Sequence, residues 1–240
     1  MVARIGVLVL AAFAAAPSPA APAGKSNLLF ILTDNQGDWT LGCYGNPDIR
    51  TPNIDRLAAE GMRFTRAFAS NAVCSPTRAT YLTGLIPSQH GVHSFLDPKY
   101  MVGPQAYDTL AEFRTLPKIL SETGYVCGLS GKWHLGANLT PHPGFSSWIT
   151  MVQGHTTEFY NLEVIEGGKI RREPKYATEL WTEHAVQFIR QNKDRPFFLY
   201  LAYNGPYGLG ALLRNEARNR HRDYYADKLF PSFPRDAMHP

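Results

Sequence analysis

Cysteine is scarce in this chain, which holds three among 240 residues: Cys43, Cys74 and Cys127. An odd and small number does not make the disulfide framework that holds small secreted domains together. Cys43 and Cys127 could pair, but both fit buried thiols better, since Cys127 stands in an apolar run where small hydrophobic residues belong. Stability therefore has to come from a packed core.

A block of one charge is also missing. The 24 Lys and Arg residues and the 20 Asp and Glu residues leave a net charge of +4 with His neutral, and no basic cluster stands out. This mild excess gives little support for nucleic-acid binding, although a few of the cations could serve an anionic substrate. With 44% hydrophobic and 18% charged residues, the composition is that of a globular domain with one large core.

After residue 23 no apolar run is long enough to span a bilayer. The first 23 residues differ from the rest, because Arg4 is their only charge, residues 5–16 are apolar, and a segment rich in Pro and Ala follows. This pattern predicts a signal peptide at residues 1–23. A short membrane anchor is the alternative. We expect an exported protein, periplasmic or extracellular, without a stable membrane span, whose catalytic domain is residues 24–240.

Apolar runs and amphipathic segments alternate along that domain. Continuous apolar runs, typical of parallel strands buried on both faces, occur at residues 27–33, 125–129 and 197–203, and an alternating run predicts another strand at 62–68. Start and stop signals predict helices at 52–60, 75–83 and 116–122, with Thr51 and Ser75 as the first two caps, and an amphipathic pattern predicts a helix at 177–192. Residues 141–175 look irregular and polar, with a hairpin near Gly167. This alternation predicts an α/β fold with a mostly parallel central sheet.

Polar side chains follow the predicted strands at the points where they end. Asp34 and Asn35 follow the first strand, Lys132 and His134 follow the strand at 125–129, and Asn204 follows the last one. Ligands of open α/β sheets bind at the carboxyl ends of the strands. We therefore expect one site to collect these segments together with the start of the helix at 75–83.

Three runs carry a resemblance to a known family. Residues 74–84 read Cys-Ser-Pro-Thr-Arg-Ala-Thr-Tyr-Leu-Thr-Gly, residues 131–136 read Gly-Lys-Trp-His-Leu-Gly, and residues 51–57 read Thr-Pro-Asn-Ile-Asp-Arg-Leu. In this order they resemble the sulfatase family over about residues 27–210. The resemblance implies the alkaline-phosphatase-like α/β sandwich. It also implies that Cys74 is oxidised to formylglycine by a formylglycine-generating enzyme; a buried thiol is the alternative.

The implied chemistry is hydrolysis of a sulfate monoester in a sulfated small molecule or glycan. The hydrated aldehyde offers one hydroxyl to attack sulfur and a second whose deprotonation expels sulfate, whereas a serine would stay esterified. The helix N-terminus at Ser75 would add N–H groups that face the anion. Arg78, one turn later, would hold the diol or its metal.

The resemblance further implies a divalent cation, commonly Ca²⁺, bound by Asp34, Asn35 and the modified Cys74. The family usually has two adjacent acids where this chain has Asp-Asn, and an amide oxygen still suits a hard cation but lacks charge. Asp38 could compensate, and Asn35 could instead be a turn residue. Lys132 would contact the sulfate and His134 the diol or the leaving group, unless Lys132 is a surface residue. His90 and His93 could line the pocket or be solvated.

Two departures leave other functions open. Tyr207 stands where the family usually has a catalytic His, and no second acidic metal pair is found after residue 210. No strand pattern follows residue 203 either, so we expect the chain to be the truncated N-terminal portion of the domain, with an unpaired edge at its last strand. The alternatives are a phosphomonoester or phosphonate hydrolase of the same superfamily, and a non-catalytic fragment or binding protein.

Overall fold

The computed structural model describes residues 24–207 and 219–232 of the chain. The expected signal peptide at residues 1–23 and most of the polar tail lie outside these described residues. Within them, no helix has both the length and the apolar character needed to cross a bilayer.

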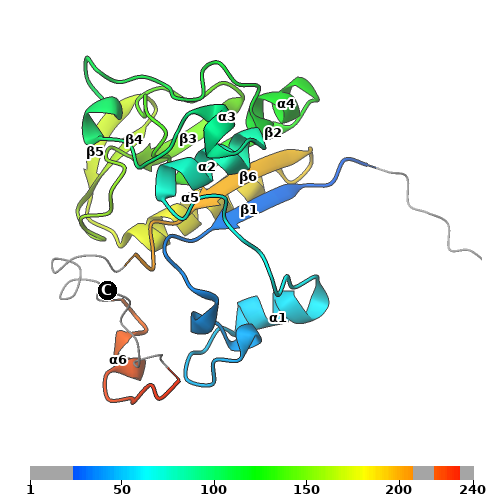
Figure 1. Cartoon of the computed structure of the whole chain (residues 1–240), viewed down its shortest axis with the longest axis vertical. Coiled ribbons are helices and arrows are strands. Elements are labelled where there is room, and N and C mark those ends of the chain that lie inside the picture. The colour runs from blue at the N-terminus through cyan, green and yellow to red at the C-terminus, as the bar shows by residue number, and fades with distance from the viewer. Residues whose placement is uncertain (1–23, 208–218, 233–240) are drawn as a thin grey trace, which may run out of the picture.

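Six strands of the described chain form one sheet in the order β1-β6-β2-β3-β4-β5 (Figure 1). The first four neighbours are parallel: β1 (Leu28–Leu32), β6 (Phe197–Ala202), β2 (Val126–Gly131) and β3 (Phe145–Met151). The last two run antiparallel to their neighbours: β4 (Leu162–Glu166) and β5 (Lys169–Glu173). The predicted α/β fold with a mostly parallel sheet is confirmed.

The described helices vary in length from a single turn to four turns. They are α1 (Pro52–Glu60), α2 (Cys74–Thr83), α3 (Pro87–His90), α4 (Leu116–Glu122), α5 (Ala177–Asn192) and α6 (Arg222–Tyr225), with short 3-10 turns at Asp38–Thr40, Gly42–Tyr44 and Pro98–Tyr100. The predicted helices at 52–60, 116–122 and 177–192 have the predicted bounds. The helix predicted at 75–83 begins one residue earlier, so that Val73 is its cap rather than Ser75.

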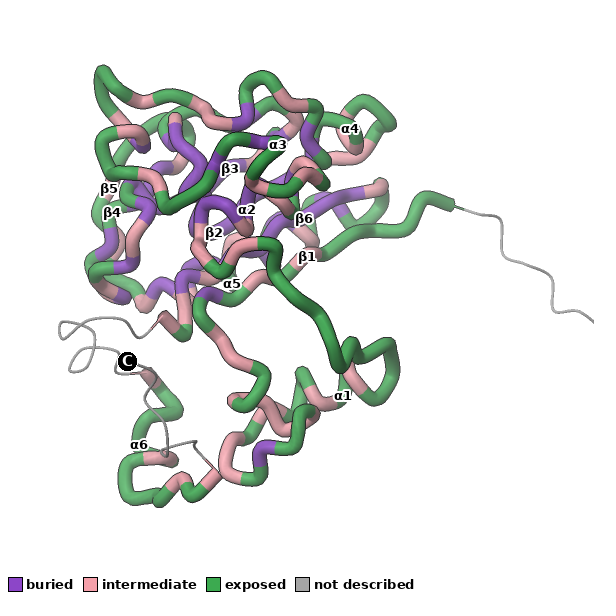
Figure 2. The backbone as a smooth tube through the Cα atoms, viewed as in Figure 1, coloured by how far each residue is buried: buried purple, intermediate pink, exposed green. Residues whose placement is uncertain are grey.

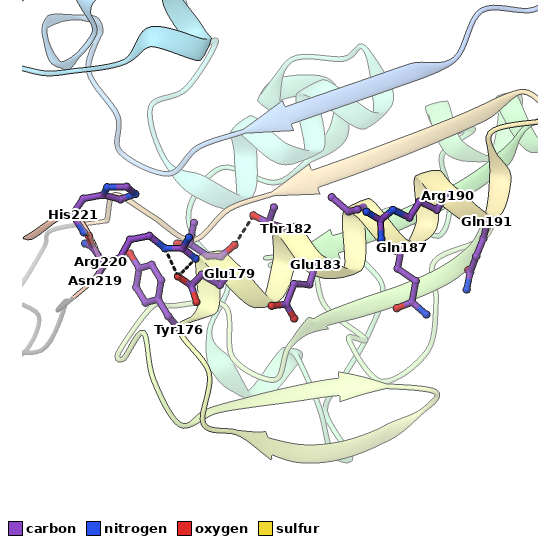
Figure 3. Close-up of a pocket in the computed structure, with 12 residues that line it drawn as sticks. Tyr176, Glu179, Thr182, Glu183, Gln187, Arg190, Gln191, Asn219, Arg220 and His221 are labelled. Atoms are coloured by element: carbon purple, nitrogen blue, oxygen red, sulfur yellow. Dashed lines mark hydrogen bonds and ion pairs between the residues drawn. The ribbon is translucent and has the colours of Figure 1, made fainter.

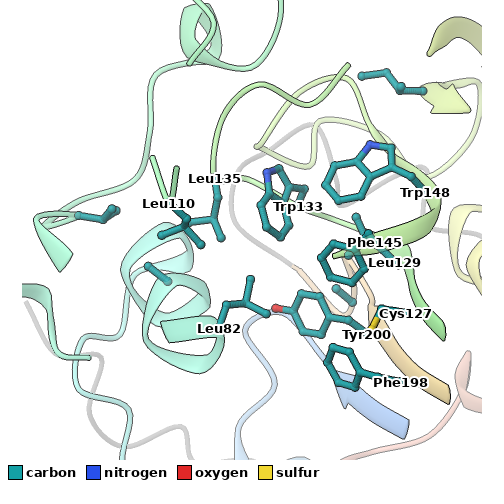
Figure 4. Close-up of a cluster of buried hydrophobic side chains, with 14 of the residues drawn as sticks. Leu82, Leu110, Cys127, Leu129, Trp133, Leu135, Phe145, Trp148, Phe198 and Tyr200 are labelled. Carbon is teal, nitrogen blue, oxygen red and sulfur yellow. The ribbon is translucent and has the colours of Figure 1, made fainter. Parts of the chain in front are cut away.

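Helices cover both faces of the central strands, which explains why β2 and β6 are almost wholly buried. On one face, Leu82 of α2 packs with Trp133, Phe198 and Tyr200 in an aromatic-rich cluster (Figure 4). On the other face, Trp181 of α5 is buried in a second cluster that reaches β4 and β6. The core sits between these layers, around the middle of the sheet (Figure 2).

The first strand does not have the environment that its sequence predicts. β1 is an edge strand paired with β6 on one side only, and Leu29 and Ile31 remain about half exposed, at 48% and 50%. The expectation of burial on both faces is wrong because α5 packs over β6 and β2 and does not cover β1. The expectation that the last strand, β6, has an unpaired edge is also wrong, since β6 lies between β1 and β2.

Two other predictions of secondary structure fail for lack of a partner. Residues 62–68 form no strand, and their apolar side chains, including Phe64 and Phe68, are exposed. The backbone of this segment has no neighbouring strand with which to pair, which an alternating pattern alone cannot supply. Conversely, residues 141–175 contain three strands, β3 to β5; the hairpin at Gly167 is confirmed, but β3 was missed.

Candidate active site

A cavity of about 410 Å³ opens where β1 ends and α2 begins. Half-buried Cys74, the first residue of α2, lines it together with residues that follow β1 and residues that precede or belong to α2: Leu32, Thr33, Asp34, Asn35, Gln36, Ala69, Ala72, Val73, Thr77, Arg78 and Tyr81. The expected meeting of the first strand end with the nucleophile helix is therefore present in the structure.

Asp34 is the centre of a buried ionic cluster at this cavity. Its Oδ2 accepts a hydrogen bond from Lys132 Nζ at 2.6 Å and lies 3.5 Å from Arg78 Nη2. Arg78 Nη1 also donates to the carbonyl oxygen of Lys132 at 2.6 Å. All three side chains are at most 5% exposed, so the surface-lysine alternative for Lys132 is wrong. Two cations against one carboxylate leave an excess of positive charge, which suits an anionic ligand.

The positions of these residues follow from close contacts between strand ends. Gly131 has φ 115°, and a Cβ there would lie 1.9 Å from the carbonyl oxygen of Ala202, so only glycine lets β2 approach β6 so closely. Lys132 N then donates to Ala202 O at 2.8 Å, while Asp34 N donates to Gly205 O at 3.0 Å. The ends of β1, β2 and β6 are thus tied together beneath the cavity.

Burial and the neighbouring Asp34 carboxylate have opposite effects on the pKa of Lys132. Desolvation lowers the pKa of its ammonium, and the neighbouring Arg78 lowers it further; Asp34 and Cys74 act in the opposite direction. A cationic lysine at this place is therefore stabilised by the Asp34 carboxylate and would gain further from a bound sulfate.

His134 is fully buried and held in one orientation. Its backbone is left-handed, with φ 57°, and its Nε2 lies 3.1 Å from the carbonyl oxygen of Leu96, to which it donates. Burial lowers the pKa of this imidazole to about 2, with Lys132 as a further cause, so it is neutral near pH 7. Its Nδ1 is a buried acceptor that has no hydrogen-bond partner among the described residues.

The residues expected to bind a cation supply oxygen ligands but not a full set. Asn35, with φ 59°, is exposed and lines the cavity beside the buried Asp34 carboxylate. This pair fits a hard cation such as Ca²⁺, which takes about six to eight oxygen ligands. No group of three or more His, Cys, Asp or Glu side chains in the described chain could hold a metal. Asp38 does not line this cavity, and its Oδ1 accepts a hydrogen bond from Trp39 N.

Other candidate residues have structural roles or lie nearby. His90 is buried, with Nδ1 accepting from Val92 N at 3.1 Å, and His93 is exposed. Asn204 Oδ1 accepts from the indole of Trp181 at 3.0 Å. The ring of Tyr207 lies 5.3 Å from Lys132 Nζ, and burial raises the pKa of its phenol, so it is a neutral neighbour of the cluster.

Sequence reasoning missed His155, whose ring lies 5.3 Å from that of His134. His155 belongs to residues 141–175, which look irregular in the sequence and have no periodic pattern that would single it out. The adjacent Gly154 lies against the same ring, since a Cβ there would be 1.8 Å from the His134 side chain, but this contact is visible only in the folded chain. The Cys43–Cys127 pairing is also excluded, since both are free thiols.

A larger cavity, about 730 Å³, runs along α5 and shares no lining residue with the cavity at Cys74 (Figure 3). Glu179, Glu183 and Arg190 line it, and an ion pair between Arg220 and Glu179 lies at one end. Among the described residues that line it there is no cysteine and no buried lysine or arginine, so size alone does not make it the better candidate. The smaller cavity is the one lined by Cys74 together with the buried side chains of Asp34 and Arg78.

A family model described as Sulfatase matches residues 26–228, which is most of the chain. The chain belongs to the sulfatase family. Among the curated relatives of this sulfatase, the N-acetylglucosamine-6-O-sulfatase of Bacteroides thetaiotaomicron is 32% identical over 86% of the chain and 34% of its own length. Arylsulfatase A of Bos taurus is 41% identical over 81% of the chain and 43% of its own length. The chain thus spans less than half the length of these relatives.

Solved structures agree with the fold. A protein in complex with its substrate D-glucosamine-2-N,6-O-disulfate superposes with a TM-score of 0.70 and 32% identity, covering 86% of this sulfatase and 39% of the other chain. Ps i-CgsB in complex with k-i-k-neocarrahexaose gives a TM-score of 0.67 and 30% identity, covering 84% and 51%. The alkaline-phosphatase-like fold expected from the sequence is confirmed over the matched part.

Proposed function

We propose that this sulfatase hydrolyses a sulfate monoester, with a nucleophile made from Cys74. One observation carries the proposal: Cys74 opens α2 in a cavity it shares with Asp34 and Arg78, and Lys132 binds the same carboxylate. A nucleophilic position beside two buried cations is the arrangement that transfer of an anionic group requires. Membership of the sulfatase family supports sulfate as the group that is transferred.

In this proposal the nucleophile, the cationic residues and the neutral histidine have different roles. Once formed, a formylglycine at position 74 would supply a hydrated aldehyde whose two hydroxyl groups serve attack and release. Lys132 and Arg78 would hold the sulfate oxygens, and their burial strengthens that attraction relative to water. Neutral His134 would accept a hydrogen bond at Nδ1 from a hydroxyl of the nucleophile or the substrate, while Leu96 fixes its other nitrogen.

A divalent cation such as Ca²⁺ would be held by Asp34 and Asn35 and would balance negative charge at the cavity. The lysine on Asp34 Oδ2 leaves Oδ1 of the carboxylate for such an ion. Because these are two side chains and a hard cation takes more ligands, we propose that the remaining ligands include position 74 and groups beyond the described residues.

A sulfated sugar is the substrate class that we propose. The relatives that support it are an N-acetylglucosamine-6-O-sulfatase and a neighbour solved with D-glucosamine-2-N,6-O-disulfate. Formation of the nucleophile would need a formylglycine-generating enzyme. The predicted signal peptide at residues 1–23 supports export of the protein. A phosphate-ester hydrolase remains the rival within the superfamily, and no comparison favours it.

The test is mass spectrometry combined with turnover. Chain produced together with a maturing enzyme should yield a Cys74 peptide about 18 Da lighter than the thiol form, because an aldehyde replaces the thiol. Cys74→Ala should abolish hydrolysis of a sulfate ester, whereas Cys43→Ala, which alters a free thiol outside the cavity, should leave it intact. An active preparation in which Cys74 is still a thiol, or faster turnover of the matching phosphate ester, would refute the proposal.

A further inference from the structure

Two rings lie side by side next to His134, outside the ionic cluster. Phe95 is 51% exposed, and its ring centroid lies 4.9 Å from that of half-buried His155, at an angle of 70°. His155 in turn lies 5.3 Å from His134. No described residue makes a hydrogen bond with the His155 imidazole, so its two nitrogens are free to bind something else. We call Phe95 and His155 the aromatic rim.

The chain fixes the aromatic rim to the nucleophile helix. Leu96 N donates at 3.1 Å to the Oγ of Ser75, which is the residue after Cys74. The carbonyl oxygen of Leu96 accepts from His134. Gly154 packs so closely on the His134 ring that it has no room for a Cβ. The two ring-bearing residues are therefore each one residue away from a contact with the site, one through Leu96 and the other through Gly154.

The chemistry of the aromatic rim differs from that of the cavity. An exposed phenyl ring offers an apolar surface to the C–H face of a sugar, and an imidazole beside it can bind a hydroxyl. Burial lowers the pKa of His155, and Lys132 lowers it further while Asp34 opposes this, so the ring is neutral and can both donate and accept. Lys132 is two positions before His134, whose ring contacts that of His155, so an anionic group and a neutral, amphipathic group would be bound at neighbouring places.

We propose that Phe95 and His155 form the subsite for the sugar part of a sulfated sugar, while Lys132 and Arg78 bind its sulfate. This inference rests on the proposed function and names the residues that select the alcohol side of the ester. It assigns the aromatic rim a role in specificity and none in the cleavage of the S–O bond.

Binding to a Cys74→Ala variant tests the inference without any requirement for maturation or turnover. Two probes are titrated by calorimetry or NMR: inorganic sulfate, which reports the cationic cluster alone, and 6-O-sulfated N-acetylglucosamine, which reports both parts. Adding Phe95→Leu or His155→Asn to this variant should lower its affinity for the sulfated sugar roughly tenfold in each case, because each substitution removes about one stacking or hydrogen-bonding contact. The affinity for sulfate should not change.

Matched controls separate this effect from a general loss of affinity. Phe64→Leu and His221→Asn make the same chemical changes at exposed positions away from the cavity and should leave both affinities unchanged. Unchanged sugar affinity in Phe95→Leu and His155→Asn, or an equal loss of sulfate affinity, would overturn the inference while the proposed function stands. Failure of the parent variant to bind either probe would overturn the proposed function, and this inference with it.

Discussion

Asp34 illustrates at the scale of one residue how the site depends on compensation of charge. Its carboxylate is nearly inaccessible to water and neutralises one of the two cations that contact it. A charge taken out of water is costly unless a partner is present, so the lysine and the arginine could not both remain buried without it. The aspartate thus serves stability as well as the proposed binding of a cation.

We predict that Asp34→Ala lowers the free energy of unfolding by roughly 3–5 kcal/mol, because it leaves Lys132 without its buried partner. Glu122→Ala is the matched control, since it breaks an ion pair with Arg114 in which both side chains are exposed and screened by solvent, and it should cost far less. Urea denaturation of the two variants and the parent measures both values. Equal costs would show that the buried pair contributes no more than a surface pair.

At the scale of elements, β1 ends at the cavity and is also an outer strand of the described sheet. Its carboxyl end places Asp34 at the cavity, while its other side pairs with no strand of the described chain, and the side chains of Leu29 and Ile31 are about half exposed. An exposed, uncharged edge strand is a template for pairing with other chains. The strand that positions the site is therefore also the place where self-association should begin.

Ile31→Lys should suppress that self-association with little loss of stability, because the isoleucine is half exposed and a lysine at an edge opposes pairing between chains. Leu229→Lys adds the same charge at an exposed position outside the sheet and should have little effect. Light scattering as a function of protein concentration gives the measurement. Suppression by both variants alike would assign the effect to net charge rather than to the edge.

The whole molecule has a dense body and a sparsely packed extension. The sheet and its covering helices hold both hydrophobic clusters, whereas α1 has no buried residue and lies, like α6, away from the sheet (Figure 1). Contacts between these outlying parts are polar or cation–π in character: Arg50 N donates to Tyr225 at 3.0 Å, and the Arg50 guanidinium lies over Tyr224. Little apolar burial stabilises this extension.

Hydrogen exchange should reveal this difference. Amides of α1 are expected to exchange at least about a hundredfold faster than those of β2 and β6, because opening α1 exposes little new apolar surface, whereas opening the strands disrupts the core. Mass spectrometry of peptides from the two regions gives the comparison within one sample. Equal protection would show that α1 unfolds only together with the sheet.

Local signals in the sequence determined much of the fold. The apolar runs at β2 and β6, the start and stop signals of α1 and α4 and the amphipathic pattern of α5 predict these elements, because each depends on residues close together in the chain. The motif residues Cys74, Lys132 and His134 were also identified from the sequence, since their spacing within short runs is itself the signal.

Only the tertiary structure decided which environment each element received. The apolar sequence of β1 is the same whether or not a helix covers it, and the strand pattern at 62–68 cannot form without a neighbour. In the same way, the carboxylate of Asp34 meets Lys132, 98 positions away in sequence, and Phe95 meets His155 because both segments pack around His134. Burial and long-range contact are properties of the packed chain, because they depend on which distant residues come to share a space from which water is excluded.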